Sequence, residues 1–427
     1  MLKYRLMWPH WGTNQMVEHH DTVIIGGGQA GLAMSFHLRE RGREHIVLER
    51  RHIGESWRSE RWNSLHFQFP NWSMQLPGMT YSGTEPDGFS HHTLTTRFIE
   101  DYAKMIDAPV RENTEATALR QDAKTGGYLI ETQNGTIAAR NVVIATGPFQ
   151  HPFIPAFGKN LPSSVYEIDA ARYRSPDELP SGAVLVVGSG ASGCQIADEL
   201  YQAGRTVFLS VSRHRRVPRR YRGKDMFWWF EKMGRFDVTV DTFPGRKYPP
   251  STVVTGVNGG YDVDIRRFIA EGVQVLGHVE GMSDSTVAVA SDVNEILNGA
   301  DKAYADFISA ADRLMIQADL RASPGENEGH APPEIFPDID TMQSLNLHDA
   351  NIGAVIWATG HRFDFGWVHL PIFDSHGAPI QQRGVTKCQG AYFLGLHWMH
   401  TFKSGLLSFV GEDAAYLADY MGSNSTV

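Results

Sequence analysis

Three glycines near the N-terminus have the spacing of a turn that binds phosphate. Gly26, Gly28 and Gly31 follow an apolar run at 21–25 and precede a stretch with helical character that extends to Gly42. The first glycine permits a sharp bend, the second lets the backbone approach a pyrophosphate, and the third lets helix and strand pack closely. The pattern predicts a strand, a tight turn and a helix that together bind a dinucleotide.

A carboxylate completes this first unit. Glu49 ends the apolar strand 45–49, about 20 residues after the central glycine, where an acidic side chain can bind ribose hydroxyls. The unit lies near the N-terminus and is followed by Gly-Glu-Ser-Trp at 54–57, so FAD suits it better than NAD. The alternative is an ordinary turn between a strand and a helix.

The same unit occurs a second time. Gly188, Gly190 and Gly193 follow the apolar run 183–187, but the next strand ends in Arg213 and a series of further arginines instead of an acid. A guanidinium can bind the 2′-phosphate of NADPH bidentately, whereas a carboxylate would repel it. We therefore predict NADPH rather than NADH, with Arg213 or an immediate neighbour on that phosphate. The alternative is a solvated basic loop, and the run holds more arginines than one phosphate needs.

Two further segments match each other and accompany the two turns. Each has the apolar character of a buried strand and ends in Ala-Thr-Gly, one at 141–147 and the other at 354–360. The cofactor contacts predicted at their ends are Thr146, Gly147, Thr359 and Gly360.

The order of these units predicts an α/β protein with two Rossmann-like dinucleotide-binding domains, one interrupted by the other. The FAD-binding domain would comprise 1–150 and 350–427, and the NADPH-binding domain 151–349 with a helical and aromatic insertion at about 213–345. Smaller predicted features are a hairpin around 128–135, a linker at 151–162, a long helix at about 293–321 and a last helix at about 404–421.

Composition excludes several other classes of protein. The 427 residues carry a net charge of −9, which argues against nucleic acid as the main partner. The two cysteines, Cys194 and Cys388, are too few and too far apart for a disulfide framework, a four-cysteine metal site or a CxxC pair. No apolar stretch approaches the roughly 18 residues that span a bilayer, and 1–20 does not resemble a signal peptide, so we expect a cytoplasmic protein without integral membrane association.

The cysteine count also bears on the chemistry. Two dinucleotide sites in one chain imply a flavin that a nicotinamide reduces, and the electrons must then leave. Without a cysteine pair or an iron–sulfur cluster to receive them, a diffusible acceptor is required, and oxygen is the leading candidate.

Together these motifs resemble the class B flavin-dependent monooxygenases, which include flavin-containing monooxygenases, YUCCA enzymes and Baeyer–Villiger enzymes. The similarity extends through nearly the whole chain and is greatest to short bacterial members. It rests on both Ala-Thr-Gly strands and on these segments: 26–33 (GGGQAGLA), Glu49-Arg50, 54–58 (GESWR), 188–193 (GSGASG), 393–398 (FLGLHW) and 403–407 (KSGLL).

The resemblance implies a monooxygenase cycle. NADPH would reduce FAD, oxygen would add to the flavin as a C4a-(hydro)peroxyflavin, and one oxygen atom would pass to a small organic substrate. By position, Trp57 would pack on the flavin, and His66 and Gln68 would approach its reactive face as the catalytic candidates. The motifs add Arg50, Ser192 and Gly395 to the cofactor-binding residues.

One family feature is altered. The fingerprint FxGxxxHxxx(W/F/Y) would end at Tyr173, which places Ser163, Val165 and Asp169 at its Phe, Gly and His positions. The change motivates two alternatives: an NADPH oxidase or flavin reductase that releases hydrogen peroxide, and a non-catalytic flavoprotein that senses NADPH. The sequence is also compatible with a homodimer.

Two other groups are interpreted as structural. His397 and His400 have a spacing seen in metal sites but lack a third ligand nearby, so we predict packing or pocket roles and no metal. The aromatic run 227–230 (FWWF) is interpreted as core or interface rather than substrate pocket, although an aromatic wall would suit an apolar substrate.

Overall fold

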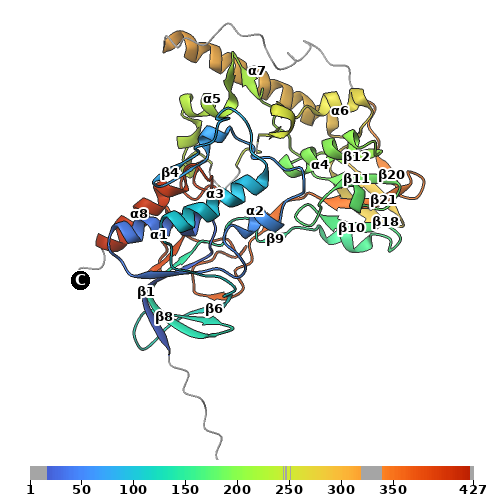
Figure 1. Ribbon diagram of the computed structural model, residues 1–427. Helices are drawn as coiled ribbons and strands as arrows, with labels where there is room; N and C mark the ends of the chain where they lie inside the picture. Colours follow the sequence, from blue (N-terminus) through green and yellow to red (C-terminus); the bar gives the residue numbers. More distant parts are fainter. Residues whose placement is uncertain (1–16, 244, 246–247, 251, 319–338, 424–427) are drawn as a thin grey trace, which may run out of the picture.

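The computed structural model describes residues 17–243, 245, 248–250, 252–318 and 339–423. Two open sheets dominate the structure, at lower left and at right in Figure 1, and the long helix α7 (Val293–Gln317) lies along the top. No described helix is long and apolar enough to cross a membrane.

The first sheet is built around β1 (Glu18–Ile25), whose Val23 and Ile24 are fully buried. It has the strand order β23-β6-β7-β8-β1-β2-β5, and β24 also pairs with β8. Strands β2, β1, β8 and β24 are parallel neighbours, whereas β6, β7 and β8 form an antiparallel meander. The other strands are β2 (His45–Leu48), β5 (Val110–Arg111), β6 (Ala116–Gln121), β7 (Tyr128–Thr132), β8 (Gly135–Ile144), β23 (Val368–His369) and β24 (Ala391–Phe393).

The second sheet is fully parallel, with the order β10-β21-β11-β12-β17. Apolar side chains cover both of its faces, as expected for a parallel sheet. A small antiparallel sheet, β18-β19-β20, extends this half. The strands are β10 (Tyr166–Asp169), β11 (Ala183–Val187), β12 (Val207–Ser210), β17 (Gln274–Leu276), β18 (Val279–Ser283), β19 (Thr286–Val289), β20 (Ser344–Asn346) and β21 (Ile352–Trp357).

Helices cover the sheets and complete the two βαβ units. Helix α1 lies between β1 and β2 and packs against α8, and α4 lies between β11 and β12. The helices are α1 (Gln29–Glu40), α2 (Glu55–Ser59), α3 (His92–Met105), α4 (Ala191–Gln202), α5 (Met226–Lys232), α6 (Ile265–Glu271), α7 and α8 (Val410–Ser423). Short two-stranded pairs are β3 (Gln75–Leu76) with β4 (Met79–Thr80), β13 (Arg220–Tyr221) with β14 (Lys224–Asp225), and β15 (Val254–Thr255) with β16 (Tyr261–Asp262).

The chain passes between the two halves twice, and the two connecting segments lie side by side. Strand β9 (His151–Pro152) leads from the first sheet to the second half, and β22 (His361–Arg362), which leads back to the first sheet, pairs antiparallel with it. The return therefore comes after Trp357, because β21 pairs with β10 and β11, and not at residue 350 where the sequence boundary was placed.

The aromatic run 227–230 forms a core between the insertion and the first half. Phe227, Trp229 and Phe230 are buried, and Phe227 contacts the rings of Phe69 and Phe409 at 4.8 and 5.8 Å. This agrees with the interpretation as core rather than substrate pocket. Helix α7 contributes Phe307 to the same cluster, and it ends at Gln317, a few residues before the predicted end at 321, which lies outside the described residues.

Other predictions agree within a few residues. The hairpin around 128–135 is β7–β8, and the last helix is α8, which starts at Val410 rather than near 404 because 401–409 forms turns. The predicted α/β class with two Rossmann-like units is confirmed.

Candidate functional site

The first glycine turn has the geometry that its spacing predicts. Gly26 has φ +117°, and a Cβ there would lie 2.5 Å from the carbonyl oxygen of Ala145. A Cβ on Gly31 would lie 1.9 Å from the carbonyl oxygen of Gly26, so helix and strand could not pack so closely with any other residue. At Gly28 a Cβ would meet nothing within 4 Å, which leaves the backbone open to a ligand.

Helix α1 begins without its own cap. Gly28 is the N-cap residue, no side chain caps the first amides, and the first turn holds no acidic residue. Helices α3, α5 and α6, in contrast, each have a capping side chain, from His91, Asp225 and Asp264. The uncapped N-terminus of α1 is therefore free to bind an anion such as a pyrophosphate.

Glu49 is fixed at the edge of this turn. It is buried, its Oε2 accepts the N–H of Gly27 at 2.7 Å, and its Oε1 accepts the N–H of Arg51 at 2.9 Å. A carboxylate held by two backbone donors keeps its position beside the turn, as ribose recognition requires.

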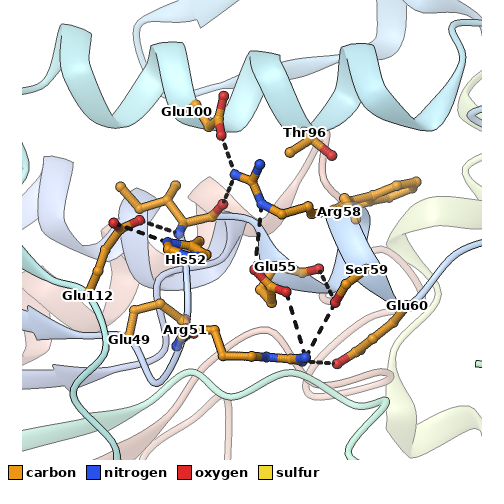
Figure 2. A network of polar contacts seen from close by, with 12 residues as sticks. Glu49, Arg51, His52, Glu55, Arg58, Ser59, Glu60, Thr96, Glu100 and Glu112 are labelled. Atoms are coloured by element: carbon orange, nitrogen blue, oxygen red, sulfur yellow. Dashed lines mark hydrogen bonds and ion pairs between the residues drawn. The ribbon is translucent and has the colours of Figure 1, made fainter.

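The segment after Glu49 is braced by ion pairs (Figure 2). Arg51 contacts Glu55 at 3.6 Å and Glu60 at 2.5 Å, and Arg58 pairs with Glu55 and Glu100. These contacts fasten the short helix α2 to the strand end and to α3. They hold in place the helix that presents Trp57 to the cleft.

One cleft collects most of the residues predicted for FAD. It is lined by the first turn, the end of β2, α2 and the end of β8. Predicted residues on its wall are Gly26, Gly28, Glu49, Arg50, Trp57, Thr146, Gly147 and Gly395. Gly395 has φ +79°, and a Cβ there would lie 2.5 Å from the Ala30 Cβ, so a glycine lets the C-terminal segment touch the start of α1.

Several wall residues were not predicted. Phe149 and Gln150 lie two and three residues after the first Ala-Thr-Gly, and that position was the available signal. The Gln150 side chain donates to Thr146 Oγ1 and to the Gly147 carbonyl, and it accepts the N–H of Asp364. It therefore links the segment before β9 to the segment after β22, the two connections between the halves. Other unpredicted wall residues are identifiable only in three dimensions, among them Arg61, Asp364 and Trp367.

The second glycine turn repeats the first. Gly188 has φ +111°, and its Cβ would lie 2.5 Å from the Ala358 carbonyl oxygen, while a Cβ on Gly193 would lie 1.9 Å from the Gly188 oxygen. Gly190 is open and starts α4, which has no capping side chain and no acid in its first turn. The half-buried Ser192 lies in that first turn.

The second Ala-Thr-Gly lies at the connection between the halves. Thr359 donates its hydroxyl to the carbonyl of Phe153, and the N–H of Phe153 donates to the Gly360 carbonyl at 2.9 Å. Neither Thr359 nor Gly360 lines the cleft of the first turn. They lie next to the paired strands β9 and β22 and so belong to the connection between the two halves.

The arginine run separates into exposed and buried members. Arg213 is exposed at the strand end beside the second turn, where Ser189 Oγ contacts the Arg213 carbonyl at 3.3 Å. Arg216 is 2% exposed and lies within 3.1 Å of Asp262 and 3.0 Å of Asp264. Arg219, also 2% exposed, pairs with Asp225 at 2.8 Å. Arg216 and Arg219 are therefore structural cations with internal partners.

The catalytic candidates His66 and Gln68 do not line the cleft. His66 Nδ1 contacts the Ser64 carbonyl at 2.8 Å, and its ring lies edge-on to His91 at 5.4 Å. Gln68 is half-buried, and its carbonyl accepts a hydrogen bond from Arg219. Between them, Phe67 is buried with its ring 6.0 Å from Trp57, so the segment reaches the cleft wall through that ring pair.

The altered fingerprint has structural roles here. Asp169 is buried and accepts the N–H groups of Ala171 and Arg172, and Tyr173 is fully buried with its hydroxyl 2.8 Å from Glu199 Oε2. Burial and the Glu199 carboxylate raise the pKa of Tyr173. These residues stabilise the turn after β10.

Among the described residues no three His, Cys, Asp or Glu side chains are grouped as a metal site. The His397 ring packs against Phe149 at 5.1 Å. His400 lies in a separate polar pocket with Lys403 and Glu412.

Two glycine turns of this kind, each between parallel strands of its own sheet, define a two-dinucleotide flavoprotein oxidoreductase, and comparison with known proteins agrees. Residues 23–225 match the family model described as pyridine nucleotide-disulphide oxidoreductase. The CzcO-like oxidoreductase of Geobacillus kaustophilus is 34% identical over 93% of this chain and 97% of its own. The probable indole-3-pyruvate monooxygenase YUCCA1 of Arabidopsis thaliana is 29% identical over 48% of this chain and 50% of its own. The flavin-containing monooxygenase from Stenotrophomonas maltophilia superposes with a TM-score of 0.66 at 17% identity, over 96% of this chain and 100% of that one.

The chain belongs to the class B flavin-dependent monooxygenase family. It is an oxidoreductase whose cofactors are FAD and NADPH, as the sequence predicted.

Proposed function

We propose that the protein inserts one oxygen atom from O2 into a small organic substrate, with NADPH as the electron donor. One observation carries this proposal: the chain has two dinucleotide turns but only two cysteines, both free, with Cys194 buried on α4. Electrons delivered to the flavin therefore have no cysteine pair to enter and must leave to a diffusible acceptor. Bound FAD supplies the electron transfer and the activation of oxygen.

The chain's own residues bind and orient the cofactors. We assign the FAD pyrophosphate to Gly28 and the N-terminus of α1, and its ribose to Glu49. The NADPH pyrophosphate is assigned to Gly190 and the N-terminus of α4, and the 2′-phosphate to Arg213. Trp57 and Phe149 on the cleft wall exclude water from the reacting atoms, and His66 and Gln68 support that wall through Phe67.

Stopped-flow spectroscopy of the purified yellow protein tests the proposal. Anaerobic NADPH should bleach the flavin at least tenfold faster than NADH. After aeration with a panel of amines, sulfides, ketones and organic acids, at least one compound should yield one oxygenated product per NADPH consumed. Absence of bound flavin, or equal reduction by both nicotinamides, would contradict the cofactor assignments.

The second candidate is an NADPH oxidase. It is motivated by Asp169 and Tyr173, which occupy fingerprint positions but are engaged in the turn after β10 and with Glu199. This reading predicts one hydrogen peroxide per NADPH, whatever compound is added. Quantifying peroxide and product in the same reaction therefore separates the two functions.

A further inference from the structure

Arg61 is a cation on the wall of the FAD cleft, enclosed by aromatic rings. It follows α2, and its guanidinium carbon lies 5.1 Å from the centre of the Trp57 ring and 5.7 Å from that of Phe149. The two rings come from separate segments, one in α2 and the other after the first Ala-Thr-Gly. Aromatic faces attract a cation but leave its hydrogen-bond donors unused.

Arg61 forms no ion pair with an acid of the described residues. No described Asp or Glu oxygen lies within 4.0 Å of it, and its one hydrogen bond to a described residue runs from Nη1 to the Glu60 carbonyl at 2.9 Å. Its neighbours differ: Arg51 and Arg58 each pair with carboxylates, as Figure 2 shows. The Glu60 carboxylate itself is bound by Arg51 at 2.5 Å.

Further donors lie behind Phe149. The rings of His361 and His397 contact Phe149 at 5.2 and 5.1 Å. Burial lowers the pKa of His361, and the positive charge of Arg61 lowers it further. The cleft wall here combines one guanidinium with two apolar ring faces, and two imidazoles that are not themselves cleft-lining residues pack against Phe149.

Both cofactors have other sites for their phosphates. The open Gly28 and the uncapped α1 serve the first dinucleotide, and the open Gly190, the uncapped α4 and the exposed Arg213 serve the second. Arg61 is therefore available for a third anion. A guanidinium fork fits a carboxylate bidentately, and the flanking rings fit a flat apolar body.

We propose that Arg61 binds the carboxylate of an aromatic or unsaturated organic acid, and that such acids are the substrate class of this enzyme. The assignment rests on the proposed function, which places substrate in this cleft. Trp57 and Phe149 would pack on the apolar part of the acid, so Arg61 would orient the substrate from its carboxylate end.

Ligand binding to the oxidised, FAD-loaded protein tests this without turnover. The probes are phenylacetate and indole-3-acetate, each compared with its neutral amide, and the readout is the perturbation of the flavin absorbance. In the wild type each acid should bind at least tenfold more tightly than its amide. Arg61→Gln should abolish this preference, Arg61→Lys should restore part of it, and Arg140→Gln, which removes an exposed guanidinium of β8 outside the cleft, should leave it unchanged.

The same variants distinguish a carboxylate from a cofactor phosphate. Arg61→Gln should keep its FAD affinity and its anaerobic Kd for NADPH within threefold of the wild type. A tenfold loss of either would assign Arg61 to a cofactor phosphate and overturn the proposal, as would equal binding of acids and amides by the wild type. Failure of the proposed function is a separate result, because it appears as stoichiometric peroxide with every compound while the preference for acids persists.

Discussion

The guanidinium of Arg219, in the insertion of the second half, donates a hydrogen bond to the backbone carbonyl of Gln68 in the first half. The same group pairs with Asp225 at 2.8 Å and lies 3.9 Å from the centre of the Phe89 ring. A single buried cation thus connects the start of α5 to the segment that reaches Trp57 through Phe67. The insertion is therefore fastened to the cofactor half by charge as well as by its aromatic core.

Arg219→Ala should destabilise the protein by about 3–5 kcal/mol, because the Asp225 side chain, only 9% exposed, would be left without its cation. Urea unfolding followed by tryptophan fluorescence measures the loss. Adding Asp225→Asn to this variant should recover part of the stability, since the uncompensated charge is then gone. A loss below about 1 kcal/mol for the single variant would show that the pair is not buried in solution.

The glycines of the second turn should respond oppositely to alanine. Gly190→Ala should fold normally and retain FAD, because its Cβ meets nothing within 4 Å, yet its Kd for NADPH should rise at least tenfold as the methyl group meets the pyrophosphate. Gly193→Ala should lose about 3 kcal/mol or more of stability, because its Cβ would lie 1.9 Å from the Gly188 oxygen. Thermal unfolding and anaerobic NADPH titration measure the two effects. Tight NADPH binding by Gly190→Ala would contradict the assigned site.

Local patterns predicted the parts of the fold that depend on local spacing. The two turns, their strands and Glu49 lie as expected because steric limits on a tight turn act over a few residues. The boundary at 350 could not be read correctly, because both Ala-Thr-Gly strands are apolar and only pairing assigns β21 to the second sheet. Likewise, nothing in the sequence marks Arg216 and Arg219 as buried, since their acidic partners are brought together by folding.

The candidate site follows the same division. Residues within the motifs, such as Gly28 and Thr146, line the cleft, whereas His66 and Gln68 do not. Their placement came from family position, and alternation along an extended segment turns neighbouring side chains to opposite sides. Arg61 had no signal of its own, because its lack of a carboxylate partner becomes visible only when Arg51 is seen to bind Glu60.

Arg213 should control the choice between nicotinamides. Arg213→Ala removes an exposed guanidinium beside the second turn, so it should lower the preference for NADPH over NADH by about 10- to 100-fold, which corresponds to one or two charged hydrogen bonds. Anaerobic reduction rates at several concentrations of each nicotinamide give the preference. Unfolding stability should not change.

Arg216→Ala is the matched control, because its buried guanidinium has Asp262 and Asp264 as partners and its loss should lower stability. An unchanged preference in Arg213→Ala would move the 2′-phosphate to another residue.

His214, next to Arg213, should make stability depend on pH. It is buried, and burial lowers its pKa from 6.5 to about 4, although Asp264 opposes the shift. In the unfolded chain this imidazole is protonated below about pH 6.5, whereas in the folded protein it stays neutral down to about pH 4. Between these two pH values protonation favours the unfolded chain, so the stability of the folded protein decreases as the pH falls. Between pH 7 and pH 5 the loss should be about 2 kcal/mol. Urea unfolding at both pH values should show a smaller loss in His214→Phe than in the wild type. His348→Gln, whose side chain is exposed, should behave as the wild type. An equal pH dependence in His214→Phe would show that His214 is not the buried neutral imidazole described here.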